Sequence, residues 1–223
     1  YKYPQTRKKA MKAKKVNLKF FPEGGNLVKG VPSQVAFEAT DAYGNPITLF
    51  GRIINRRKEE IGHFATIHEG RGVFTYIPTG EDADKAEVEL GGKKYRFDLP
   101  EVCSQGYVLH VDNLTSEDSI AVSVQKNTYT PSNLLGLAVI AHGKLLNSCL
   151  LNVGKNTPVS FKLDKSEWTP GVVQLVLFDT AGQIIADRLV FTRKPELLAV
   201  DVRKSKESYQ PFERVTLDFS VRD

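Results

Sequence analysis

Residues 168–191, WTPGVVQLVLFDTAGQIIADRLVF, contain two apolar, alternating runs on either side of a short turn. Alternation with a period of two is typical of a β-strand with one buried face. Between the runs, residues 179–182 (DTAG) combine an aspartate that can bond its own backbone with a glycine free to take positive φ. The stretch therefore predicts a β-hairpin, and nothing in it has the pattern of a catalytic motif.

Similar short runs precede this hairpin, at residues 107–111, 120–124, 134–141, 145–153 and 159–163. A helical turn is expected at residues 164–168, where Asp164 suits a cap and Pro170 ends the segment. Together with the hairpin, these runs predict a β-sandwich over residues 101–195.

A separate group of seven runs covers residues 16–21, 33–40, 49–55, 63–67, 72–77, 85–90 and 93–99. Gly91-Gly92 predicts a two-residue hairpin turn between the last pair. This group predicts a sandwich over residues 16–100, with boundaries at Pro100-Glu101 and Lys194-Pro195. Residues 196–223 are expected to begin a further, truncated β domain. The chain starts without Met and stops inside an alternating run, so we expect an internal fragment of a longer protein.

Prolines at strand entrances indicate internal repetition. Tyr129-Thr130-Pro131 and Tyr209-Gln210-Pro211 each precede an alternating run, as Pro32 does in the first group. Pro32 and Pro131 are each followed twelve residues later by a glycine, Gly44 and Gly143. Proline cannot donate to a neighbouring strand, so it suits a strand entrance. The pattern predicts tandem copies of one fold.

The net charge of +5 comes from a basic arm, residues 1–15, and from Lys19 just after it. These first residues contain eight Lys or Arg and no acid before Glu23; without the eight, 23 basic residues face 26 acidic ones. Without interleaved aromatic residues, the arm predicts a solvated linker rather than a nucleic-acid partner. No apolar run approaches the roughly 18 residues of a membrane span.

The side chains that could act in catalysis or bind a metal are scattered along the chain, so we expect no catalytic, cofactor-binding or metal-binding residues. The hydroxyls considered as nucleophiles have no His and Asp at motif spacing, and the histidines have no metal-ligand spacing. The hydroxyls are Thr128, Thr130, Ser132 and Ser160, and the histidines are His63, His68, His110 and His142.

Two further features leave alternatives open. Cys103 and Cys149 would form a disulfide in an oxidising compartment, but Cys149 lies in an apolar run, where a buried free thiol is common. Free thiols are the favoured interpretation. Residues 81–84, from Glu81 to Asp84, offer oxygens for Ca²⁺, although a solvated acidic loop is the simpler hypothesis.

Three segments resemble a known family. FFPEGGNLV at residues 20–28, VAFEA at 35–39 and DAYGNP at 41–46 resemble the macroglobulin-like domains of large envelope proteins in Bacteroidetes-type bacteria. PGVVQL at 170–175 and DRLVF at 187–191 resemble the neighbouring domain there. YQPFERV at 209–215 resembles the opening of a further such domain, with Phe212 in place of the expected glycine.

The resemblance implies an extracytoplasmic chain, periplasmic or associated with the outer membrane, of seven-stranded immunoglobulin-like sandwiches. In complete α2-macroglobulins such domains frame a bait region and a thioester that traps proteases. The thioester motif GCGEQ is absent, so neither Cys103 nor Cys149 takes that role. Some relatives carry TonB-receptor plug domains instead. DSI at 118–120 and DTA at 179–181 resemble the O-glycosylation acceptor pattern of this bacterial group.

Two functional hypotheses remain, and an enzyme is not expected. The first is a non-catalytic structural and interaction module, whose partners are other domains of the same chain and a protease or an outer-membrane protein. The alternative is a carbohydrate-binding sandwich of a glycan-uptake system, which requires a row of exposed aromatic side chains. The aromatic candidates are Tyr43, Tyr76, Tyr95, Tyr107, Tyr129 and Trp168, and they are scattered along the chain. The expected core residues are Val35, Phe37, Phe74 and Tyr76 in the first domain and Leu137, Val139, Leu175 and Leu177 in the second.

Overall fold

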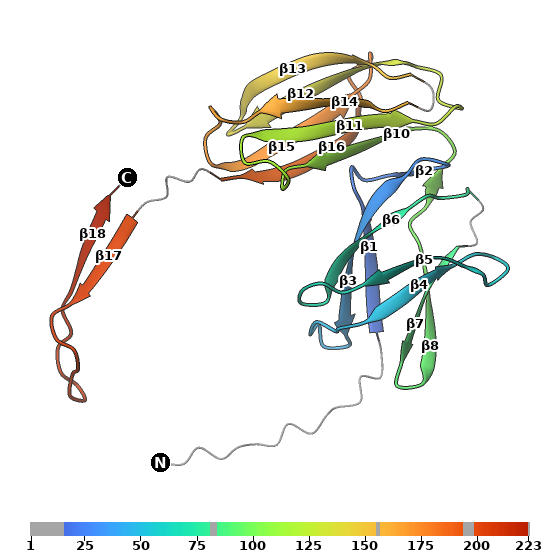
Figure 1. Ribbon diagram of the computed structural model, residues 1–223. Coiled ribbons are helices and arrows are strands. Elements are labelled where there is room, and N and C mark those ends of the chain that lie inside the picture. Colours follow the sequence, from blue (N-terminus) through green and yellow to red (C-terminus); the bar gives the residue numbers. More distant parts are fainter. Residues whose placement is uncertain (1–15, 81–83, 155–156, 194–198, 223) are drawn as a thin grey trace.

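The computed structural model describes residues 16–80, 84–154, 157–193 and 199–222, which form β-strands and no helix (Figure 1). The expected fold class is confirmed: the described chain is all-β, with two tandem antiparallel sandwiches. The basic arm, the boundary at Lys194-Pro195 and most of the Glu81–Asp84 loop lie outside the described residues.

The first sandwich consists of a three-stranded and a four-stranded sheet. The three-stranded sheet has the order β1-β3-β6 and the other has the order β5-β4-β7-β8, with antiparallel pairing throughout. The strands are β1 (Val16–Pro22), β3 (Ser33–Asp41), β4 (Phe50–Ile54), β5 (Glu60–Ala65), β6 (Arg71–Tyr76), β7 (Lys85–Leu90) and β8 (Lys93–Asp98).

The second sandwich repeats this arrangement with sheets β10-β11-β14 and β13-β12-β15-β16. Its strands are β10 (Tyr107–Asp112), β11 (Ser119–Lys126), β12 (Leu134–Ala141), β13 (Lys144–Asn152), β14 (Val159–Asp164), β15 (Gly171–Phe178) and β16 (Ile184–Thr192). In both sandwiches the first, second and fifth strands form one sheet, and the remaining four form the other. The hairpin predicted within residues 168–191 is the pair β15–β16.

The proline motifs do not mark equivalent positions in the two sandwiches. Pro32 precedes β3, the second strand of its sandwich, whereas Pro131 precedes β12, the third strand of its own. Proline suits any strand entrance, so the shared spacing to Gly44 and Gly143 does not align the domains. The repetition therefore lies in strand order rather than in these motifs.

Each sandwich has its own apolar core, built from the inward positions of alternating strands. All eight expected core residues are buried. In the first core, Phe37 and Phe64 pack edge to face, with ring centroids 4.9 Å apart. Each ring covers a glycine on the paired strand: a Cβ added to Gly51 would lie 2.3 Å from Phe64, and one added to Gly72 would lie 2.6 Å from Phe37. These glycines leave the space that the rings fill.

One five-residue turn occurs three times, beginning at Asp41, Asn55 and Asp179. In each, the first side chain accepts bonds from the backbone N–H groups two and four residues later. The fourth residue has positive φ, which glycine adopts without strain; it is Gly44 or Gly182 in two cases and Lys58, at φ 65°, in the third. The expected Gly91-Gly92 turn joins β7 and β8, with both φ values positive.

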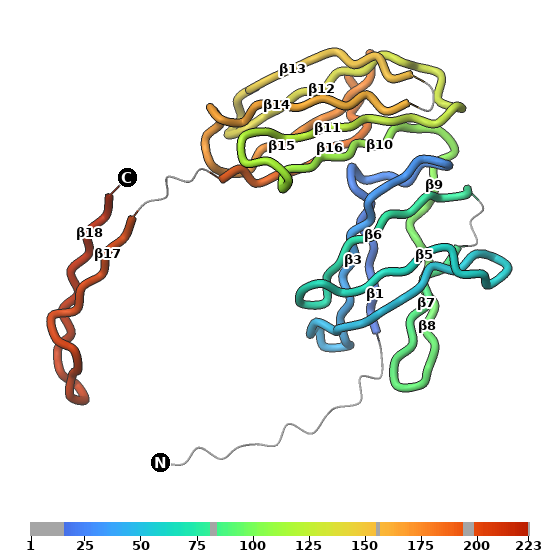
Figure 2. The backbone as a smooth tube through the Cα atoms, in the orientation of Figure 1, coloured from blue at the N-terminus to red at the C-terminus, as the bar shows by residue number. Residues whose placement is uncertain are grey.

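Two local features differ from the sequence predictions. Residues 164–168 form a single turn instead of a helical one: β14 extends to Asp164, whose side chain accepts from Ser166 N, and Trp168 N donates to Lys165 O. Strands β2 (Leu27–Val28) and β9 (Val102–Cys103) pair in parallel, and two residues are too few for a visible alternation. Figure 2 shows β9 where the chain passes from one sandwich to the other. Because β9 pairs back onto β2, the boundary at residues 100–101 stays a prediction.

The last described element is a hairpin of β17 (Ala199–Lys204) and β18 (Leu217–Arg222). Its strand register places five apolar side chains on one face, with Lys204 at the end of that face, and the remaining charged side chains on the other face. The apolar side chains are Val200, Val202, Leu217, Phe219 and Val221, and all are exposed. Glu213 N donates to Gln210 O across a turn in which Phe212 has φ 67°. The expected glycine position is therefore a positive-φ position.

Candidate functional site

A set of long-range polar contacts joins the two sandwiches around the carboxylate of Glu23. This residue directly follows β1, and its side chain is 8% exposed. Its Oε1 accepts from Val111 N at 3.1 Å and from Arg188 Nε at 3.1 Å. Its Oε2 lies 2.6 Å from His110 Nδ1. One side chain of the first sandwich is therefore held by β10 and β16 of the second.

Glycine permits the close approach of the two sandwiches beside Glu23. Gly24 has φ 74°, and a Cβ added there would lie 3.3 Å from the Ala186 Cβ. Asn26 Nδ2 donates to Ile185 O at 3.3 Å, so the loop after β1 lies along β16. The sequence stretch PEGGN thus ends a strand and also contacts the second sandwich.

The segment between the sandwiches is bonded on both sides. Lys29 N donates to Cys103 O at 3.0 Å, next to the parallel pair of β2 and β9. Asn127 Nδ2 donates to Ser104 O at 2.7 Å and to Lys29 O at 3.2 Å. Val28, Val31 and Val108 form a small buried cluster at the same place. This backbone is consequently fixed by both domains.

Lys126, at the end of β11, is fully buried with its ammonium group bonded to three oxygens. Its Nζ donates to Thr130 O at 2.7 Å, Ser132 O at 2.9 Å and Asn133 Oδ1 at 2.6 Å. Thr130 Oγ1 accepts from Gly106 N at 2.7 Å. The motif Tyr129-Thr130-Pro131 therefore belongs to a loop that is bonded to the buried lysine through Thr130 O and to the linker through Thr130 Oγ1.

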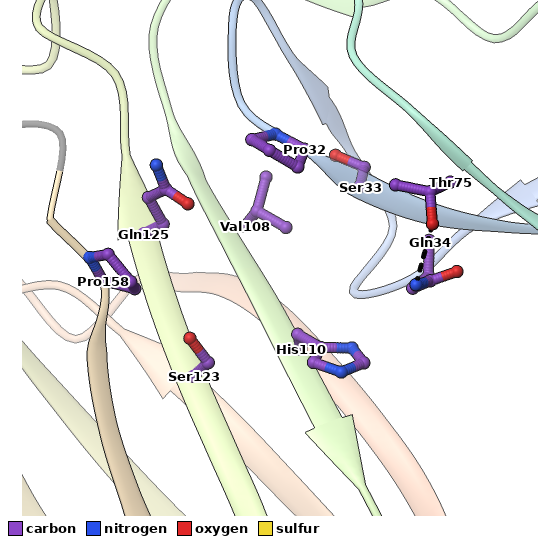
Figure 3. Close-up of a pocket in the computed structure, with 9 residues that line it drawn as sticks. All are labelled: Pro32, Ser33, Gln34, Thr75, Val108, His110, Ser123, Gln125 and Pro158. Carbon is purple, nitrogen blue, oxygen red and sulfur yellow. Dashed lines mark hydrogen bonds between the residues drawn. The ribbon is translucent and has the colours of Figure 1, made fainter. Parts of the chain in front are cut away.

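Two shallow grooves follow the junction and share Gln125. One, of about 200 Å³, contains His110 and Ser123 in its wall (Figure 3). The other, of about 330 Å³, contains Lys29 and Tyr129 in its wall. His110 is bonded to Glu23, and Ser123 accepts from Ser160 Oγ at 3.1 Å, so among the described contacts these two side chains are not a nucleophile and base pair.

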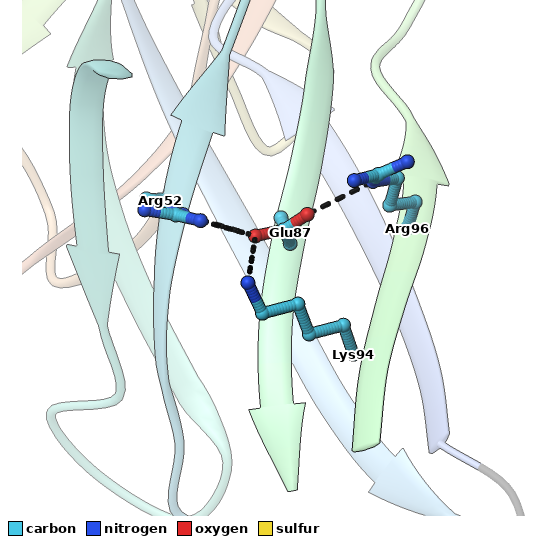
Figure 4. A network of polar contacts seen from close by, with 4 residues as sticks. All are labelled: Arg52, Glu87, Lys94 and Arg96. Carbon is cyan, nitrogen blue, oxygen red and sulfur yellow. Dashed lines mark hydrogen bonds and ion pairs between the residues drawn. The ribbon is translucent and has the colours of Figure 1, made fainter. Parts of the chain in front are cut away.

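A second buried carboxylate, Glu87, lies on the outward face of the first sandwich (Figure 4). Arg52 donates from Nε and Nη2 to Oε1 at 3.0 and 2.6 Å, and Arg96 Nε donates to Oε2 at 2.9 Å. Lys94 Nζ lies 3.8 Å from Oε1. The bonds from Arg52, followed by those from Arg96, lower the pKa of Glu87 from its ordinary value. Both oxygens are occupied, which suits a structural role.

The residues singled out from sequence remain apart. Cys103 and Cys149 are both free thiols, as favoured, and burial raises the pKa of the Cys149 thiol. Across the described residues, no three His, Cys, Asp or Glu side chains gather as a metal site. Asp84, the one described member of the acidic loop, is buried and accepts from Tyr76 Oη at 2.6 Å.

The aromatic candidates do not form a row in the described structure. Tyr76, Tyr107 and Trp168 are buried, whereas Tyr43 and Tyr129 are exposed on different sandwiches. An aromatic contact that the sequence did not reveal is Phe50 stacked on His63, with ring centroids 5.9 Å apart. The carbohydrate-binding alternative therefore has no aromatic row to support it here.

Sequence reasoning missed Glu23, His110 and Arg188 as a group. His110 and Arg188 lie 87 and 165 residues after Glu23 in the chain, so no local spacing connects the three residues. The available signal was an isolated glutamate beside two glycines, in a loop otherwise interpreted as a turn.

No protein-family model and no curated protein sequence matches the chain. A search of solved structures finds the native conformation of E. coli alpha-2-macroglobulin at 14% identity and a TM-score of 0.28, covering 90% of this chain and 16% of that one. The chain thus spans a small part of that protein's length, and a likeness this low carries no argument about function. The described residues contain no apolar helix long enough to cross a bilayer.

Proposed function

We propose that the two sandwiches form a non-catalytic structural and interaction module of the macroglobulin-like type, in which the junction holds both domains at a fixed angle. The observation that carries the proposal is the Glu23 carboxylate, bonded at once to His110, Val111 and Arg188 of the other domain. Charge-assisted hydrogen bonds of this kind are stronger and more directional than neutral ones. Such a junction favours limited rather than free movement between domains.

The partners proposed are further domains of a larger bacterial cell-envelope protein. The β17–β18 hairpin supports this, because an isolated two-stranded sheet with one apolar face is at best marginally stable in water. If the hairpin begins a third sandwich, the other sheet of that sandwich would cover its apolar face. In the first two sandwiches the four-stranded sheet covers β1–β3 and β10–β11 in this way. An extracytoplasmic location, with a role in protease trapping or outer-membrane uptake, is part of the same proposal and derives from the family resemblance.

The test is the relative orientation of the two sandwiches in solution, measured by NMR residual dipolar couplings on the full chain. In the wild type, one alignment tensor should fit the couplings of both domains. In Glu23→Ala the tensors should separate, because His110 and Arg188 lose their shared acceptor. Glu87→Ala is the matched control: it removes an equally buried carboxylate whose partners lie within one sandwich.

The control should lower the stability of the first sandwich and leave one common tensor. Different tensors in the wild type, or a common tensor in Glu23→Ala, would contradict the proposed rigid module.

A further inference from the structure

The outward face of sheet β13-β12-β15-β16 is apolar, although no described residue covers it. Its register aligns Leu150, Gly136, Phe178 and Ile184 in one row across the sheet, and Leu145, Ile140, Gln174 and Leu189 in another. We call the following exposed side chains the apolar face: Leu145, Leu150, Val172, Ile184, Leu189 and Phe191, each between 53% and 75% exposed. Half-buried Phe178 lies over Gly136, where an added Cβ would be 2.2 Å from its ring.

The first sandwich supplies an internal comparison, because its four-stranded sheet has the same strand order. There the outward positions carry Arg52, Glu87 and Arg96 in one row and Lys85 and Asp98 in another. A charged outward face is therefore compatible with this fold. Strands that are apolar on both faces are typical of sheets covered on both sides. The apolar face thus has the composition of a buried surface.

Its size agrees with one side of a protein interface. A Val, Leu, Ile or Phe side chain buries roughly 60–120 Å² of apolar area when it is fully covered. Scaled by their exposure, the six side chains present about 200–450 Å² before Phe178 and Ile140 are counted. One partner in a standard interface contributes about 800 Å², of which a little over half is apolar.

We propose that the apolar face binds the same face of a second copy of this chain, sheet against sheet. The occupant must itself be nearly uncharged, since a buried unpaired charge is strongly unfavourable. Asp187 is the one charged residue at the outward positions of these four strands; it lies on the edge strand and accepts from Gln174 Nε2 at 3.1 Å. Two copies therefore meet without a central like-charge contact. Twofold symmetry also gives the two contacting surfaces the same area, because both protomers use the same face.

The charged face of the first sandwich is an unsuitable occupant, because it would bury Arg52, Lys94 and Arg96 against apolar side chains. The apolar side of the β17–β18 hairpin is the competing surface within this chain. It presents two strands rather than four, so it would leave part of the apolar face exposed.

The experiment is sedimentation equilibrium of the full chain over a range of protein concentration. We expect a reversible dimer that persists at high salt, as apolar association does. Leu189→Lys should raise the dimer dissociation constant by about a hundredfold or more, since both protomers carry the charge. Val73→Lys is the matched control: Val73 is half exposed on the three-stranded sheet of the first sandwich, and its variant should dimerise as the wild type does.

Circular dichroism of both variants should show the wild-type fold, because both positions are exposed. A wild type that remains monomeric at about 100 µM would overturn the proposal. It would also fail if Phe219→Lys, on the hairpin, dissociated the dimer while Leu189→Lys did not; the hairpin would then be the occupant.

Discussion

Replacing Lys126 by Met tests whether the buried ammonium stabilises the second sandwich. The substitution keeps an unbranched side chain of similar length and removes three hydrogen bonds, to Thr130 O, Ser132 O and Asn133 Oδ1. Ser132 O keeps its bond from Tyr107 Oη, and Asn133 is exposed, so its amide oxygen regains water, whereas Thr130 is buried. One unsatisfied buried carbonyl costs about 1–3 kcal/mol.

The variant no longer buries an ammonium group, and the desolvation free energy that it avoids offsets part of the lost hydrogen bonding. We therefore expect a net destabilisation of about 1–3 kcal/mol. For a unit of this size, each kcal/mol lowers the midpoint of thermal unfolding by about 4–8 °C. Trp168 is the chain's one tryptophan and lies in the core of the second sandwich, so its fluorescence reports that domain's unfolding in urea.

Lys144→Met is the control, because Lys144 is exposed at the start of β13 in the same sandwich. It should leave the free energy of unfolding unchanged. If Lys126→Met proved as stable as the wild type, the bonds to Lys126 would contribute nothing beyond the desolvation they offset, and the reasoning would be refuted.

Three further predictions follow from single residues. Lys58 occupies the positive-φ position of its turn, so Lys58→Gly should stabilise the first sandwich by about 0.5 kcal/mol, while Arg57→Gly should not; equal effects in thermal unfolding would contradict this. The lowered pKa of Glu87 contributes stability above its ordinary value of 4.5 that is lost as pH falls through the lowered pKa. The difference in unfolding free energy between wild type and Glu87→Gln should therefore narrow from pH 7 to pH 3, and a constant difference would count against the ion-pair explanation. Cys103 is exposed and burial raises the pKa of Cys149, so a thiol reagent at pH 8 should show one fast and one slow reaction, with Cys103→Ser removing the fast one. Two equal rates would argue against this assignment.

The strands were predictable because alternation with a period of two is a local property. Val35 and Phe37, or Leu175 and Leu177, differ from their neighbours in hydropathy, and burial follows directly. The turn at Gly91-Gly92 was predictable for a similar reason, since glycine adopts the positive φ that both turn positions require. Boundaries were less accurate, as at Asp164, where pairing with Ser119 extends β14 and decides the conformation.

The junction was beyond local reasoning. Glu23 contacts Arg188 only because two sandwiches fold and then meet, and neither residue's neighbours indicate the other. Similarly, the pairing of β2 with β9 involves two residues on each side, which present no periodicity to detect. Sequence patterns thus predict the strands within each sandwich, whereas the contacts between sandwiches join residues that are far apart in the chain.

The position of Glu23 also affects how the pair of domains would transmit mechanical force. Glu23 follows the first strand of the first sandwich, and Arg188 belongs to the last strand of the second. A pull applied at Val16 and Thr192 therefore loads the Glu23–Arg188 contact, together with the bonds from His110, Val111 and Asn26 beside it. We expect extension of the chain to begin with separation of the two domains, before either sandwich unfolds.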